Sequence, residues 1–172
     1  MEEDKAFFIA FSRTIGHEGG YVDDPTDPGG ETKFGISKRS YPGENIRTLT
    51  VERARELYRR DYWDRLKLGQ ISAVAIAGEI FDTAVNMGRQ QATLIAQRAV
   101  NFLGGAVAED GIMGPGTLGA LNYLAVKDAE ALFRCLNGEQ YAVYKEIIEH
   151  RPLSQKYVRG WMRRIQDYRQ EG

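Results

Sequence analysis

The chain has 172 residues, of which 42% are hydrophobic and 27% charged, a composition that excludes disordered, collagen-like and coiled-coil proteins. The formal net charge of -1 provides no overall attraction to nucleic acid or anionic lipid, so neither is an expected partner. The single cysteine, Cys135, excludes an intramolecular disulfide and any cysteine-based zinc site.

The N-terminus begins with acidic residues, and its apolar stretch is short and interrupted by polar side chains. This pattern lacks the basic start and continuous apolar region of a cleavable signal peptide. No run approaches the roughly 18 to 20 apolar residues that a membrane span needs. We therefore expect synthesis in the cytoplasm without a signal peptide, and no stable membrane insertion.

The first 47 residues divide into a helix and a loop. Phe7, Phe11 and Ile15 recur at helical spacing, which predicts a helix over residues 5–17 that ends at the following glycines. Residues 22–47 have no helical period and are rich in Asp, Pro, Gly and Thr. They are typical of a long loop or a small β-hairpin.

Two helices are predicted next. Thr50 is the expected N-cap of a second helix with an apolar stripe, and Ser72 is the expected cap of a third that ends at Met87. The third helix is apolar almost all round, which indicates a central helix buried by its neighbours. Asp82 and Asn86 lie one turn apart on it and share a face.

The remaining chain is predicted to be helical as well. Apolar spacing indicates helices at 92–103, 117–124, 128–149 and 154–168, with the Gly104-Gly105 pair ending the first and Pro152 separating the last two.

Glu18 falls at the predicted C-terminal end of the first helix, where the helix dipole disfavours a negative charge. Partial burial would raise its pKa further, and a carboxyl that stays protonated near neutral pH is suited to general acid catalysis. The alternative is an ordinary solvated acid at a helix end. Asp27 follows nine residues later and Thr32 five after that, which supplies a second carboxylate and a hydroxyl to hold water.

Three segments carry a resemblance to a known family: Glu-Gly-Gly-Tyr at 18–21, the Pro- and Gly-rich loop at 24–36, and Phe-Asp-Thr-Ala-Val-Asn-Met-Gly at 81–88. Together they resemble glycoside hydrolase family 108, the N-acetylmuramidases of phages and bacteria. Residues 110–115 and the Gly160-Trp161 pair resemble the peptidoglycan-binding-like region that accompanies this family's catalytic part.

The resemblance implies a fold and a catalytic residue. The fold would be mainly α, a lysozyme-like helical bundle with a small loop or β-hairpin lobe beside the catalytic cleft. Glu18 matches the family's catalytic glutamate. The order Glu, Asp, Thr also resembles the triad of phage lysozymes, although the spacing from Glu to Thr is one residue shorter. Asp27 would stabilise the transition state or assist the water, and Thr32 would position that water.

The same resemblance suggests which residues touch the substrate. Aromatic rings could stack on sugars, although aromatics at helical spacing more often belong to the core. Asp82 and Asn86 would contact substrate, or would instead form a buried polar pair that satisfies backbone groups of the loop. The expected substrate-binding residues are Tyr21, Phe34, Gly35, Trp63, Asp82 and Asn86.

The implied activity is hydrolysis of the β-1,4 bond between N-acetylmuramic acid and N-acetylglucosamine, with Glu18 as general acid and inversion at the anomeric carbon. No metal or other cofactor is expected.

Residues 1–90 would form the catalytic part and 91–172 the peptidoglycan-binding-like part, packed together as one unit. The partner would be peptidoglycan glycan strands, reached at the cell wall with the help of a holin or secretion system. The alternative is a non-catalytic wall-binding or secretion-helper protein on the same fold, since homologues are also labelled secretion activators.

Overall fold

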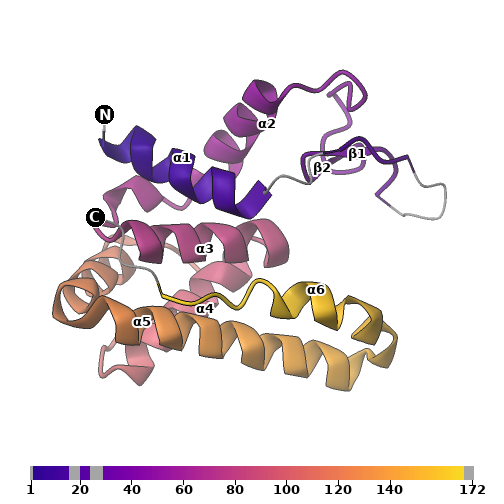
Figure 1. The fold of residues 1–172 in the computed structure, drawn as a ribbon. Coiled ribbons are helices and arrows are strands. Elements are labelled where there is room, and N and C mark those ends of the chain that lie inside the picture. The colour runs from indigo at the N-terminus through magenta and orange to yellow at the C-terminus, as the bar shows by residue number, and fades with distance from the viewer. Residues whose placement is uncertain (1, 16–19, 24–28, 169–172) are drawn as a thin grey trace.

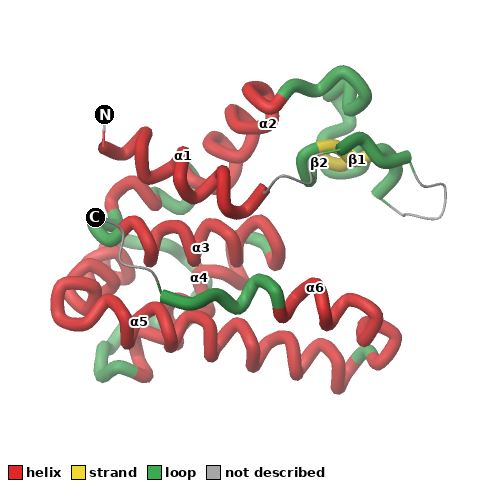
Figure 2. Tube along the Cα trace, in the orientation of Figure 1, coloured by secondary structure: helices red, strands yellow, loops and turns green. Residues whose placement is uncertain are grey.

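The computed structural model describes residues 2–15, 20–23 and 29–168, and it is mainly helical with one small antiparallel hairpin (Figures 1 and 2). This architecture confirms the mainly α prediction with a hairpin lobe. The elements in chain order are α1 (Glu2–Ile15), β1 (Thr32–Lys33), β2 (Ile36–Ser37), α2 (Val51–Tyr58), the π-helix η1 (Arg59–Trp63), the 3-10 helix η2 (Leu68–Gln70), α3 (Val74–Met87), α4 (Arg89–Phe102), α5 (Pro115–His150), the 3-10 helix η3 (Pro152–Tyr157) and α6 (Val158–Met162).

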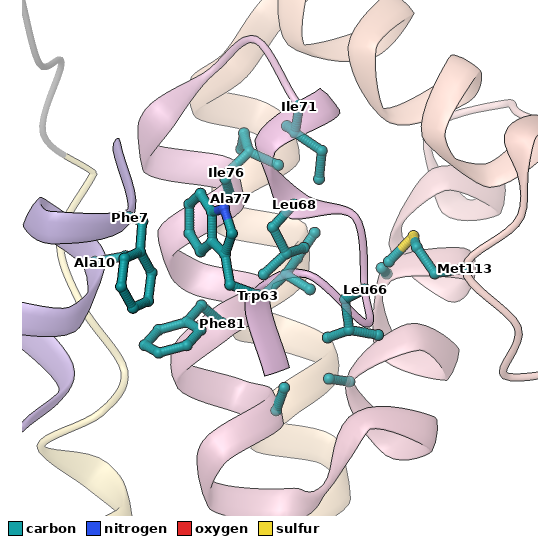
Figure 3. Packing of buried hydrophobic residues seen from close by; sticks show 14 of the residues in the cluster. Phe7, Ala10, Trp63, Leu66, Leu68, Ile71, Ile76, Ala77, Phe81 and Met113 are labelled. Carbon is teal, nitrogen blue, oxygen red and sulfur yellow. The ribbon is translucent and has the colours of Figure 1, made fainter. Parts of the chain in front are cut away.

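The core forms around α3, which contacts α1, α4 and α5. Phe81 on α3 meets Phe7 of α1 at 5.9 Å and Trp63 of η1 at 5.8 Å between ring centroids. Figure 3 shows these rings beside the aliphatic side chains of η2 and α3. Because α3 is covered on most sides, its nearly uniform apolar sequence is explained, and the prediction of a central buried helix is confirmed.

In the hairpin lobe, a two-residue turn, Phe34-Gly35, joins β1 to β2, and Lys33 pairs with Ile36 across the turn. Both central residues have positive φ, 51° at Phe34 and 74° at Gly35, as a type I′ turn requires. Positive φ is uncommon for a bulky residue such as phenylalanine. The Tyr58 hydroxyl donates to the Phe34 carbonyl at 3.2 Å, and this hydrogen bond attaches the turn to the end of α2.

The start of α2 agrees with the cap predicted from the sequence, whereas the start of α3 does not. The Thr50 hydroxyl accepts from the Arg53 N–H at 3.2 Å, as an N-cap should. The predicted Ser72 cap is wrong, because α3 begins after Ala73 and has no side-chain cap. Ser72 instead directs both its N–H and its hydroxyl to the Asn122 side chain on α5, a tertiary contact that the local sequence does not reveal.

Helices α3 and α4 meet at a single residue, Gly88, with φ of 88°. Helix α5 contains a kink at Asp128, whose φ and ψ are -162° and 86°, so its two parts correspond to the two helices predicted there. The Asp128 carboxylate accepts from the Ala131 N–H at 2.9 Å and caps the second part.

The predicted helix at 154–168 is wrong. The chain forms η3 and the five-residue α6, and the segment that follows lies between α3 and α5 in a non-helical conformation (Figure 1). Its groups are used in tertiary contacts: the Gln166 N–H donates to the Asn137 side chain at 3.0 Å, and the Tyr168 ring packs on Phe133 at 5.6 Å. These contacts replace the local hydrogen bonds that a helix would make.

Across the described ranges, no helix is both long enough and apolar enough to cross a membrane.

The hairpin turn generates a stability prediction. A Cβ added at Gly35 would lie 2.5 Å from the Tyr58 hydroxyl oxygen, and the positive φ adds strain. Gly35→Ala should therefore lower the free energy of unfolding by about 1 to 3 kcal/mol. Urea denaturation followed by circular dichroism measures this change. Gly43→Ala is the control, since a Cβ there meets nothing within 4 Å, and equal stability of the two variants would contradict the proposed clash.

Candidate substrate-binding cleft

The two proposed catalytic carboxylates, Glu18 and Asp27, lie outside the described residues. The structure describes the chain up to Ile15 and again from Gly20. Ile15 is the last residue of α1, and its Cδ1 lies 4.0 Å from the position of a Cβ at Gly35. The chain therefore enters the segment of Glu18 directly beside the hairpin turn.

Thr32, the third proposed catalytic residue, is the first residue of β1. Its backbone forms two hydrogen bonds of 2.8 Å with Val22, so residues 22 and 32 are held together. The Thr32 hydroxyl donates to the Gly30 carbonyl at 3.2 Å. Its oxygen keeps lone pairs that could accept a hydrogen bond from water.

Tyr21 is fixed by its neighbours in the lobe. Its hydroxyl donates to Glu31 at 2.8 Å and accepts from Arg47 at 3.2 Å, while the Arg47 guanidinium lies 5.1 Å from the ring centre. The hydrogen bond to Glu31 raises the pKa of Tyr21. Tyr21 thus joins the start of the lobe to residues 31 and 47. The Arg47 guanidinium covers a face of the Tyr21 ring on which a sugar would have to stack.

The prediction that Trp63 stacks on a sugar needs correction. Its side chain is 0% exposed and lies in the core, where it packs against Phe7 and Phe81 (Figure 3). Because the ring has no accessible face, it has a packing role. Phe34, in contrast, is partly exposed, with the Lys33 ammonium 5.4 Å from its ring centre.

A polar stripe runs along one face of α3 at helical spacing, formed by Glu79, Asp82, Thr83 and Asn86. The Asn86 amide donates to the Tyr144 hydroxyl at 2.6 Å, and the Gln140 amide of α5 donates to the Thr83 hydroxyl at 3.1 Å. Asp82 and Asn86 therefore do share a face, as predicted.

Asp82 forms an ion pair with Arg164, whose guanidinium donates to the carboxylate at 2.8 Å. The Asp82 side chain is only 4% exposed and Arg164 is 32% exposed. Burial raises the pKa of Asp82, and the adjacent guanidinium opposes that shift. Oδ1 of Asp82 is thus paired with a protein cation, an interaction that neither sequence-based alternative, substrate contact or loop support, included.

Asn86 lies at the edge of a depression of about 420 Å³ between the C-terminal ends of α3 and α5 and the short α6. Tyr144 and Trp161 line it and stack on each other, with centroids 5.0 Å apart and planes inclined by 8°. Arg151 and His150 add polar groups to the wall. Aromatic rings combined with an amide suit a neutral, N-acetylated sugar.

The sequence did not single out Tyr144 or Glu79. Glu79 is 3% exposed, and its Oε1 has no hydrogen-bond partner within the part of the chain that the structure describes. Burial, followed by the charge of Asp82, raises the pKa of Glu79 to about 8. The sequence did contain a signal for Glu79: like Asp82, it is an acidic residue in an otherwise apolar helix.

The residues described offer no group of three or more His, Cys, Asp or Glu side chains arranged to hold a metal ion.

Comparison with protein families assigns the two halves of the chain. Residues 11–88 match the model for glycosyl hydrolase 108, and residues 91–166 match the model for a predicted peptidoglycan domain. The fold and these matches define a cell-wall protein that hydrolyses or binds peptidoglycan. Residues 11–88 thus match glycosyl hydrolase family 108, the family that the sequence motifs resemble.

A solved structure described as "Structure of Brucella abortus SagA" is similar to this chain, with 27% sequence identity and a TM-score of 0.74. The similarity covers 94% of this chain and 90% of that chain. A search of curated proteins found no match. The structural likeness therefore extends through both family regions.

The buried Glu79 generates a pH prediction. Its folded-state pKa of about 8 exceeds the ordinary value of 4.5, so the folded protein binds this proton more tightly than the unfolded chain does. The resulting stability is fully present below pH 4.5 and is lost as pH rises through about 8. Glu79→Gln cannot ionise and should remove this loss.

Thermal unfolding at pH 5 and pH 9 measures the effect. The wild-type Tm should fall between these values by roughly 3 °C or more beyond the fall seen in Glu79→Gln. Glu149→Gln, at an exposed acid of α5, is the control and should follow the wild type. Parallel pH profiles for wild type and Glu79→Gln would show that Glu79 does not titrate in this range.

Proposed function

We propose that the protein is an N-acetylmuramidase that hydrolyses the β-1,4 bond between N-acetylmuramic acid and N-acetylglucosamine. The observation that carries the proposal is the glycosyl hydrolase 108 match over residues 11–88, which contains Glu18 within the Glu-Gly-Gly-Tyr motif. Glu18 donates a proton to the leaving sugar oxygen. Asp27 stabilises the positive charge of the transition state or assists the water, and Thr32 positions that water.

The described residues support a division of roles in substrate binding. Phe34 offers a partly exposed ring on the hairpin, and Asn86 with the stacked Tyr144 and Trp161 offers a second contact surface. Gly35 allows the turn that presents Phe34, while Tyr21 holds the lobe in place. Asp82 acts indirectly, since its ion pair with Arg164 fixes the segment after α6 beside α3.

The C-terminal half contributes binding in this proposal. We assign catalysis to residues 1–90 and peptidoglycan binding to 91–172, with the two parts packed through α3, α4 and α5. The protein acts on the cell wall, and a holin or a secretion system provides its release. Peptidoglycan glycan strands are the proposed substrate.

Replacement of Glu18 tests the mechanism. Glu18→Gln removes the transferable proton and should lower the rate by about 10² to 10⁴ while wall binding is retained. Release of reducing ends from purified peptidoglycan measures turnover, and co-sedimentation with the wall measures binding. Glu52→Gln, at an exposed acid of α2, should keep wild-type activity. A Glu18→Gln variant with half of the wild-type turnover would remove Glu18 from the mechanism.

Hydrolysis should invert the anomeric carbon. A retaining enzyme needs a carboxylate about 5 to 5.5 Å from the acid, whereas an inverting enzyme leaves about 6.5 to 9.5 Å for a water molecule. A hydroxyl such as that of Thr32 suits the orientation of water and does nothing for a direct carboxylate nucleophile. Proton NMR of the first-formed sugar should therefore show the α anomer. A β product, or a covalent glycosyl adduct on Asp27, would identify a retaining mechanism.

A non-catalytic wall-binding or secretion-helper protein is the second candidate. The match of residues 91–166 to a predicted peptidoglycan domain favours it, because recognition of peptidoglycan does not require turnover. In that case wild type would bind purified peptidoglycan and release no reducing ends.

A further inference from the structure

A second groove adjoins the depression at Asn86. It has a volume of about 1240 Å³. Its lining comes from Tyr62 and residues 65–67, from residues 87–91 and Leu94 around the first turns of α4, and from the loop at 110–113. Met87 and Gln91 line both hollows. A polymer seated at Asn86 could therefore continue over these two residues into the second groove.

Three cations line this second groove: Arg65, Lys67 and Arg89. Arg65 and Lys67 are exposed, and neither has an ion pair or side-chain hydrogen bond among the described residues. Arg89 donates to the backbone carbonyl of Asp61 at 2.6 Å. The Asp61 carboxylate itself is held by Arg60, at 2.8 and 2.6 Å, so it does not neutralise Arg89 by a direct contact.

Asp110 is the acidic residue in the lining, and its role is structural. Its Oδ1 accepts from the Gln97 amide and from the Ile112 N–H, both at 2.8 Å. These hydrogen bonds lower the pKa of Asp110 and keep its charge directed at the loop. The groove thus has excess positive charge, in a chain whose formal net charge is -1.

Two backbone features give the groove a defined shape. Lys67 has φ of 54°, an unfavourable conformation for a residue with a side chain, and it stands between the buried Leu66 and Leu68. Gly111 has φ of 72°, and a Cβ there would lie 2.7 Å from the Gln90 side chain, so the loop approaches α4 closely. One wall is therefore anchored to the core, and the other lies close against α4.

We propose that this groove binds free carboxylates on the peptide branches of peptidoglycan, while the neutral glycan occupies the depression at Asn86. The inference rests on the proposed wall substrate. N-acetylglucosamine carries no charge, and neither does N-acetylmuramic acid where its lactyl carboxyl is amide-linked to a peptide branch. The peptide branches end in free carboxylates, so unpaired cations beside a sugar-binding surface match the peptide part of the polymer. The same cations explain how a nearly neutral protein approaches an anionic wall.

The test compares two double variants that lose the same charge. Arg65→Gln/Lys67→Gln removes two groove cations, and Lys127→Gln/Arg134→Gln removes two exposed cations from α5 as the matched control. Each is made in the Glu18→Gln background and co-sedimented with purified sacculi at low salt. A parallel set uses sacculi whose carboxylates have been converted to methylamides, which leaves the glycan unchanged.

The groove variant should bind native sacculi about fivefold more weakly or worse, and the control should bind like its parent. The parent should bind methylamidated sacculi as weakly as the groove variant binds native sacculi. This comparison changes the ligand only and therefore does not depend on the folding of a groove variant. Equal binding by parent and groove variant, an equal loss in the control, or full parent affinity for methylamidated sacculi would overturn the proposal.

Reducing-end release by the wild type, measured on the same native sacculi, separates this inference from the proposed function. Carboxylate-dependent binding without turnover would support the groove and remove the muramidase activity. Turnover by the wild type together with unchanged binding by the groove variant would support the muramidase activity and reject the carboxylate-binding groove.

Discussion

The ion pair between Asp82 and Arg164 holds together parts of the structure that are 82 residues apart in sequence. It joins the buried face of α3 to the segment after α6, which forms few local hydrogen bonds of its own. Removal of Arg164 would leave the 4% exposed carboxylate of Asp82 buried without its partner, a change that typically costs several kcal/mol. Trp161, which stacks on Tyr144, precedes Arg164 by only three residues, so the ion pair also fixes one wall of the depression at Asn86.

Much of the helical fold follows from apolar spacing and capping residues. The Thr50 cap, the buried α3 and the interruption at Asp128 were all visible in the sequence, because each depends on residues within one or two turns. The errors occur where a distant contact replaces a local one. Ser72 bonds to Asn122 on α5 and does not cap α3, and the segment around Arg164 exchanges helical hydrogen bonds for contacts with α3 and α5.

The site was less predictable than the fold, for physical reasons. Motifs located the hairpin and the polar positions of α3, but periodicity could not distinguish an aromatic ring that faces a ligand from one that faces the core, as Trp63 shows. The stack of Tyr144 on Trp161 depends on the return of the chain after α5, which no local pattern encodes. Glu18 and Asp27 were singled out by their positions in the chain and by resemblance to known hydrolases, and not by helical periodicity.

The direct junction of α3 and α4 at Gly88 affects how this protein could evolve. The glycosyl hydrolase 108 match ends at residue 88 and the peptidoglycan domain match begins at residue 91, yet one hydrophobic cluster contains Phe81, Ile95 and Leu132 from both sides of this point. Gene shuffling that exchanged the second region would expose half of a shared core. Selection should therefore retain the two regions as an inherited pair, with compensating substitutions across the α3–α4 boundary.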